Sequence, residues 1–309
     1  MLSTVLPLFL VIVLGYAAIR SGYVRAEQIG PIAGFVVRIA LPALIFNAVT
    51  SVSPGDALNW AFIAGYGGAS LLTLGLGLSA GLLLFGLRVG PAAIMGLGMA
   101  GSNSGFMGYP LALSVIGGAA APMLAQCMLI ENLLIIPLAL TIAEVSGGRA
   151  GGGAMRRVLI STVNNPVLPA VLVALSVSML RIPVPMPVQQ GIDMLADVAA
   201  PIALFVVGGT IATTPFRGML GQVSAVALGK LVLHPVLVFG ALSLAPGIEP
   251  VTIAGGMLFA AVPMMTIYPI LGQRAGIGMM GASALVGATV ASFATLLVAV
   301  HLATGILGG

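Results

Sequence analysis

Two apolar stretches of this chain are interrupted by short runs of residues that could bind a small anion. The first run, Gly101 to Pro110, reads Gly-Ser-Asn-Ser-Gly-Phe-Met-Gly-Tyr-Pro, and the second, Pro263 to Pro269, reads Pro-Met-Met-Thr-Ile-Tyr-Pro. Because proline removes a helical hydrogen bond and glycine lowers helix propensity, we expect a broken helix at each run. The N-terminus of a half-helix offers free N–H donors and a positive partial charge, which suit a carboxylate.

Side chains in and near the two runs complete the predicted site. Asn103 and Ser104 add donors to the first break, and Asn47 lies in an apolar helix that could face the same place. The predicted substrate-binding residues are Asn47, Asn103, Ser104, Gly105, Tyr109, Pro110, Pro263, Thr266, Tyr268 and Pro269. The alternative is that the Pro and Gly kinks serve only helix packing.

The two breaks occupy equivalent places in an internal repeat. One ungapped shift lays Tyr109-Pro110 onto Tyr268-Pro269. The same shift pairs Pro7, Pro42 and Pro91 with Pro166, Pro201 and Pro250, respectively. We therefore predict two copies, residues 1–145 and 158–309, joined by a cytoplasmic linker at 146–157 that is rich in Gly and Arg. Duplicated membrane halves that are interrupted at the same place are typical of secondary transporters, whose site lies where the halves meet.

The composition places the whole chain in a lipid bilayer. Hydrophobic residues make up 60% and charged residues 6%, with a mean hydropathy of +1.20, whereas soluble domains carry about 25% charged residues. A helical span needs roughly 20 apolar residues. We expect ten helices, near 2–20, 30–50, 59–86, 91–116, 120–143, 158–180, 191–212, 218–244, 250–271 and 277–303.

Basic residues are distributed unevenly among the expected connections. Those after odd-numbered helices hold Arg20, Arg25, Arg88, Arg149, Arg156, Arg157, Arg217 and Arg274, and those after even-numbered helices hold Arg181. Because basic flanks resist translocation, both termini should lie on the outer (periplasmic) side of a bacterial inner membrane. The same explanation accounts for the net charge of +4, so no nucleic acid is expected as a partner.

Five spans per copy would give the two copies opposite orientations in the membrane. The expected fold class is therefore all-α integral membrane, with ten transmembrane helices in two inverted five-helix repeats and broken helices 4 and 9 that cross.

Several charged residues fall inside expected spans, where each costs about 2.5–3.5 kcal/mol on insertion scales. Glu131, beside Asn132, could bind and release a proton; the alternative is a structural hydrogen bond. Arg38 and Asp197 are equivalent in the repeat and could pair, or reach the interface from helix ends. Lys230 and His234, one turn apart, are expected to form a structural pair or to snorkel.

The segment Asn103-Ser-Gly-Phe-Met-Gly-Tyr-Pro110, with Leu41-Pro-Ala-Leu-Ile-Phe46 upstream, resembles the auxin efflux carrier family, whose bacterial members include malonate and malate permeases. The resemblance implies a fold similar to that of sodium/bile-acid symporters. In that fold, helices four and nine cross at broken midpoints and one domain carries the substrate in an elevator-like movement. It also implies that Asn103, Tyr109, Pro110 and Pro269 lie at a crossover that receives an organic anion.

Two departures from the family pattern limit what is carried over. Plant members often have a long hydrophilic segment between helices five and six, where this chain has only Ser146 to Arg157, which argues against assuming auxin as the substrate. Val262 and Pro263 stand in the second break where Asn103 and Ser104 stand in the first, so the polar contacts that helix nine makes in some relatives are in doubt.

These observations predict a secondary active transporter (permease) of a small organic anion, a mono- or dicarboxylate such as malonate or malate. An exporter of an auxin-like aromatic carboxylate, a sodium-coupled organic-anion symporter and an anion channel stay open as alternatives. An enzyme is not expected, because His234 and His301 are far apart and no nucleophile-base or metal-ligand motif is visible. No cofactor is expected, since no phosphate loop is present. The coupling ion, proton or sodium, and a homodimer also stay open.

Overall fold

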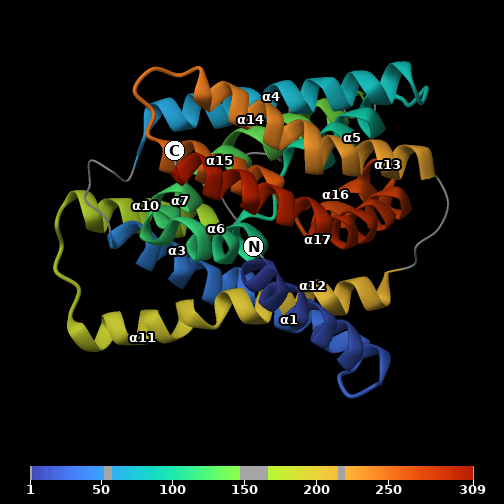
Figure 1. Ribbon diagram of the computed structural model, residues 1–309. Helices are drawn as coiled ribbons and strands as arrows, with labels where there is room; N and C mark the ends of the chain where they lie inside the picture. Colours follow the sequence, from blue (N-terminus) through green and yellow to red (C-terminus); the bar gives the residue numbers. More distant parts are fainter. Residues whose placement is uncertain (1, 52–57, 147–165, 215–219, 309) are drawn as a thin grey trace.

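The computed structural model describes residues 2–51, 58–146, 166–214 and 220–308, and within these ranges the secondary structure is helical with no strand (Figure 1). The α-helices are α1 (Leu2–Arg20), α2 (Ile29–Phe35), α3 (Leu41–Thr50), α4 (Trp60–Leu83), α5 (Val89–Ala100), α6 (Tyr109–Ile116), α7 (Ala120–Ile130), α8 (Ile136–Ser146), α10 (Val167–Met179), α11 (Met186–Asp197), α12 (Ala199–Thr213), α13 (Leu220–Leu228), α14 (His234–Ser243), α15 (Pro250–Ala261), α16 (Tyr268–Arg274) and α17 (Gly278–Gly308).

The helices are long and apolar enough for a membrane protein. Among the described residues, seven helical segments have the length and hydropathy of a membrane span, and Leu168–Met179 and Pro250–Ala261 are shorter apolar helices. The chain is therefore an integral membrane protein. The count of ten spans and their inverted-repeat arrangement remain predictions. The connector at 147–157 and the expected helix start at 158 lie outside the described residues.

The described helices lie close to the expected ranges, with two larger differences. The helix expected at 277–303 continues to Gly308. The helix expected at 191–212 begins at Met186 and is divided at Val198, between α11 and α12. Pro201 explains the division, because its ring and missing N–H disfavour helix through the residues before it.

Proline also widens four other helices. π-Helical segments occupy Val36–Ala40, Ser104–Gly108, Glu131–Ile135 and Gly229–Leu233. The second residue after each of them is a proline, namely Pro42, Pro110, Pro137 and Pro235. A proline ring clashes with the carbonyl four residues back, and an i→i+5 turn relieves that clash. Proline thus locates these wide turns, which contain Arg38, Ser104, Glu131 and Lys230.

The helices pack as two groups. We call α1, α2, α3, α10, α11 and α12 the flanking group, in which α1 packs on α12 and α3 packs on both α10 and α11. We call α4–α8 and α13–α17 the crossover group, in which α4 packs on α5 and α14, and α15 packs on α14 and α17. In Figure 1 the labels α1, α3, α11 and α12 lie on the lower side and α4, α5, α13 and α14 on the upper side. The groups meet mainly where α3 packs on α7, α1 on α6, and α12 on the segment Ser104–Gly108.

Close backbone approach holds the flanking group together. A Cβ atom at Gly15 would overlap the backbone oxygen of Phe205, and a Cβ atom at Gly208 would overlap the backbone oxygen of Ile12. Glycine at these two places lets α1 and α12 approach at van der Waals distance of their main chains, which is a common way to associate helices in lipid.

We expect Gly208→Ala to destabilise the protein by roughly 1–3 kcal/mol, because the added methyl group forces α1 away from α12. The free energy of unfolding, measured by SDS titration in mixed micelles, checks this. Gly240→Ala is the control, since no heavy atom lies within 4 Å of a Cβ built there. Equal stability of the two variants would contradict the close approach.

Candidate functional site

The two broken helices meet through their main chains. α5 ends at Ala100 and α15 at Ala261, and the residues that follow, Gly101 and Val262, are extended. The backbone N–H of Asn103 donates to the carbonyl oxygen of Pro263 over 2.9 Å. The side-chain Nδ2 of Asn103 donates to Thr266 Oγ1 over 3.2 Å. Asn103 therefore joins the two breaks twice.

Glu131 is hydrogen-bonded to two residues of the first break. Its Oε1 accepts from the backbone N–H of Ser102 over 3.2 Å and from Ser104 Oγ over 2.7 Å. Glu131 is buried, with 3% of its surface exposed. A half-helix N-terminus was expected to receive the carboxylate of a substrate. In this conformation it receives the protein's own carboxylate, and Ser104 is bound to Glu131.

Lys230 lies at the end of α15, just before the second break. It is fully buried, and its Nζ donates to Ser102 Oγ over 2.7 Å and to the carbonyl oxygen of Ala260. Ala260 lies in the last turn of α15, where a cation interacts favourably with the unpaired carbonyl groups and the helix dipole. Ser102 thus stands between the two buried charges, with its N–H bound to Glu131 and its hydroxyl bound to Lys230.

The polar network continues into α14 and α4. Lys230 Nζ lies 3.0 Å from His234 Nδ1, and His234 Nε2 lies 2.9 Å from Ser70 Oγ, which donates to the carbonyl oxygen of Tyr66. With Lys230 as an ammonium group, which has only donors, Nδ1 is the acceptor and the imidazole proton is on Nε2. The Tyr66 hydroxyl is 3.3 Å from Ser102 Oγ and closes the ring of contacts. The expected Lys230–His234 pair is confirmed, and the snorkelling alternative is wrong because both side chains are fully buried.

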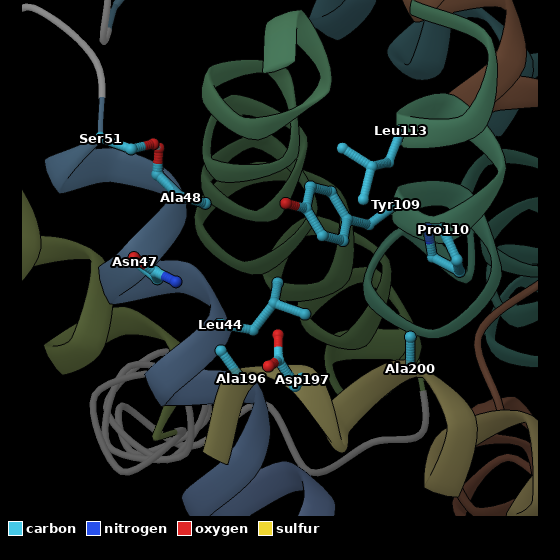
Figure 2. A pocket seen from close by; sticks show the side chains of 10 residues that line it. All are labelled: Leu44, Asn47, Ala48, Ser51, Tyr109, Pro110, Leu113, Ala196, Asp197 and Ala200. Carbon is cyan, nitrogen blue, oxygen red and sulfur yellow. The ribbon is translucent and has the colours of Figure 1, made fainter. Parts of the chain in front are cut away.

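A cavity of about 250 Å³ lies between the two helix groups, beside the first break. Figure 2 shows its walls, with α3 on one side, α6 on the other and the α11–α12 junction below. The described residues that line it are Leu44, Asn47, Ala48, Ser51, Tyr109, Pro110, Leu113, Ala196, Asp197 and Ala200.

The predicted substrate-binding residues therefore divide between two places. Asn47, Tyr109 and Pro110 line the cavity. The remainder lie in the two breaks and do not line the cavity, namely Asn103, Ser104, Gly105, Pro263, Thr266, Tyr268 and Pro269. Among these, Tyr268 is fully buried, and within the described part of the chain its hydroxyl has no hydrogen-bond partner. The structure brings the two breaks together as expected, while the open space lies on the α6 side.

The candidate coupling residues also lie in different surroundings. Glu131 is in the crossover network, and Asn132 donates to the carbonyl oxygen of Met128 on its own helix over 2.9 Å. Asp197 lines the cavity, and Arg38 is exposed in the π-helical segment before α3. Arg38 and Asp197 do not form the pair that was one of their two predicted alternatives, since no ion pair joins these two described residues in the structure.

Sequence reasoning missed three participants. Ser102 was interpreted only as part of a helix-breaking run, although its position next to Asn103 indicated that it could take part in the same polar contacts. Gln189, whose Nε2 donates to Asn47 Oδ1 over 3.0 Å, falls just before the expected start of its helix. Lys230 received little weight, because the sequence does not show that its helix passes the end of α15.

The fold and the site define a class of protein. Broken apolar helices that meet inside a bundle, with a cavity between two helix groups, are features of membrane transporters. The model of the family described as "Membrane transport protein" matches residues 1–151 and 154–300. The chain belongs to this family, the auxin efflux carrier family that the motif at the first break indicated.

The chain is also similar to an individual transporter sequence. A Rhizobium meliloti (strain 1021) protein described as "Putative malonate transporter" is 32% identical over an alignment of 309 positions, which covers 98% of this chain and 93% of the relative.

We expect removal of either buried charge to destabilise the protein strongly. Lys230→Met or Glu131→Gln should each cost roughly 3–5 kcal/mol, because the remaining charge loses its compensation. The double variant should be more stable than the sum of the single effects predicts, by about 0.5–3 kcal/mol. The free energy of unfolding of all four proteins completes the cycle. Arg38→Gln, at an exposed position, is the control, and additive effects of the two buried substitutions would argue against coupling through Ser102.

Proposed function

We propose that this protein is a secondary active transporter of a small organic anion, a mono- or dicarboxylate such as malonate or malate. The observation that carries the proposal is the position of the cavity. It lies between two helix groups, and one of its walls is the half-helix α6, which begins with Tyr109-Pro110 at the end of the first break. The family match and the name of the Rhizobium meliloti relative support transport of this substrate class.

The proposed mechanism is an elevator-like movement of the crossover group against the flanking group. The cavity takes Asn47 and Asp197 from the flanking group and Tyr109 from the crossover group, so relative movement would open and close it. The contacts of Glu131, Lys230 and Asn103 described above all lie within the crossover group. The crossover group can therefore move as one body without breaking its buried polar contacts.

We also propose that the chain consists of two inverted repeats, 1–145 and 158–309, with both termini on the periplasmic side of a bacterial inner membrane. Equivalent elements support the repeat. α5 and α15 both have 12 residues and both end at a break, and α6 and α16 both begin with Tyr-Pro. Pro42 and Pro201 both follow an irregular helix turn. Five spans per copy would require the opposite orientations that alternating access uses.

Counterflow separates a carrier from the anion channel that the sequence left open. In proteoliposomes loaded with unlabelled malonate, we expect labelled malonate to enter faster than in empty vesicles, with a rate that saturates. A channel would show neither acceleration nor dependence on internal malonate.

Asn103→Ala should lower this counterflow by about tenfold, because it removes the side-chain bond between the two breaks. Gly240→Ala in α14 is the control for handling of the purified protein. Wild-type binding and transport in Asn103→Ala would refute the role of the crossover.

Glu131 supports a proton as the coupling ion, since it is the buried carboxylate of the crossover. We expect an inward proton gradient to accelerate malonate uptake in the wild-type protein and to accelerate it less in Glu131→Gln. The initial rate of uptake with and without the gradient measures this. If Glu131→Gln keeps the full wild-type response, Glu131 does not couple transport; if only a sodium gradient drives uptake, the coupling ion is sodium.

A further inference from the structure

We propose that the cavity selects a dicarboxylate as its monoanion, with the ionised carboxylate on Asn47 and Tyr109 and the protonated carboxyl group donating a hydrogen bond to Asp197. This inference rests on the proposed function and specifies the chemical form of the substrate. It follows from the different polar groups that α3, α6 and α11 present to the cavity.

Asn47 and Tyr109 provide donors from two facing walls of the cavity. Asn47 Oδ1 accepts from Gln189 Nε2 over 3.0 Å, which orients the amide and leaves Asn47 Nδ2 to donate. Figure 2 shows the Tyr109 ring extending from α6 across the cavity, with its hydroxyl directed towards α3. Tyr109 is half-buried, and within the described chain its hydroxyl bonds to no other residue, so it can donate to a ligand. Two donors from facing helices suit an ionised carboxylate.

Asp197 provides an acceptor from a third wall, the α11–α12 junction. It is the last residue of α11, and Figure 2 shows its carboxylate rising from that helix end into the cavity, near Leu44. An ionised carboxylate only accepts hydrogen bonds, and the C-terminal end of a helix adds negative potential. A substrate group next to Asp197 must therefore bring a proton.

The charged groups around Asp197 leave this acceptor uncompensated. Asp193, one turn earlier on α11, already accepts from Gln189 Nε2 over 2.8 Å. Arg38 lies on the segment that packs against α11 but forms no ion pair with Asp197. The helices α3 and α12, which also pack against α11, carry no titratable side chain. No Lys or Arg is found among the described residues that line the cavity.

These contacts discriminate among carboxylates. A fully ionised dicarboxylate would place its second charge next to Asp197, where like charges repel. Asp197 is exposed, and a carboxylate whose other end only accepts hydrogen bonds would gain no hydrogen bond from it. A monoanion with a donor at its second end can bond to Asp197 as well as to the donors Asn47 and Tyr109, and its proton would then move with the substrate.

Competition against labelled malonate uptake tests the inference in the wild-type protein. Malonamate carries a carboxylate and an amide N–H donor, whereas monomethyl malonate carries a carboxylate and an ester that only accepts. The two have similar size and equal charge, so their second ends differ mainly in hydrogen-bonding capacity. We expect malonamate to inhibit at a concentration about tenfold lower than monomethyl malonate, because one hydrogen bond to a charged acceptor is at stake.

Asp197→Asn should abolish this selectivity, because an amide can donate to an ester or to a second carboxylate and can also accept from an amide. We expect the preference for malonamate to disappear, and malonate uptake by the variant to depend less on the fraction of malonate present as monoanion as pH is varied. Asp193→Asn is the matched control: the same change, one turn away on α11, at a carboxylate that already has a protein partner. It should keep the wild-type selectivity.

The outcomes separate this inference from the proposed function. If no carboxylate is transported at any pH, the proposed function fails. If malonate is transported but both competitors inhibit equally, or Asp197→Asn keeps the wild-type preference, the inference is overturned and the transporter stands. A strict sodium requirement that disappears in Asp197→Asn would also overturn it, because Asp197 would then bind a cation. Uptake of labelled malonamate distinguishes the proton of the substrate from that of Glu131, since only the latter would keep malonamate uptake sensitive to a proton gradient.

Discussion

The structure depends on how two interrupted helices satisfy their main-chain polar groups inside an apolar bundle. An unpaired N–H or C=O group in such surroundings costs several kcal/mol, so a break is tolerated only where other protein groups replace the missing bonds. Here the breaks pair with each other through Asn103 and Pro263, and two buried charges complete them. Glu131 accepts from the N–H of Ser102, and Lys230 donates to the carbonyl oxygen of Ala260.

This arrangement gives opposite charges to opposite helix ends. The carboxylate of Glu131 lies at the start of a half-helix and the ammonium of Lys230 at the end of α15, which is the favourable sense for each helix dipole. Because the Ser102 side chain and backbone contact both charges, the two breaks and helices α7, α14 and α15 form one connected unit. The cavity lies outside that network, so a ligand can enter it without competing for the bonds that maintain the breaks. The crossover group thus forms one connected body, and the cavity for a ligand lies where this group meets the flanking group.

Much of the fold and part of the site could be predicted from residue types alone. Pro110 and Pro269 mark the second half of each broken helix, and hydropathy locates the apolar helices to within a few residues. The residues of the site could be predicted only in part, because the sequence shows which residues are polar but does not show which helices face one another. Of the predicted substrate-binding residues, Asn47, Tyr109 and Pro110 line the cavity, whereas Ser104 donates to Glu131. The partners of Glu131 are 27 and 29 positions away in sequence, and no local pattern indicates them.

The sequence by itself determined that the chain is an apolar helical protein, where its helices break and which family it resembles, because these properties depend on composition and on the local chemistry of proline and glycine. The tertiary structure alone decided that Lys230 lies beside the end of α15, that Gln189 orients Asn47 and that Asp197 faces Tyr109 across a cavity. Each of these arrangements brings together residues from separate helices. Their juxtaposition is set by how the helices pack, since packing depends on the shapes of whole helix faces and not on any short run of residues.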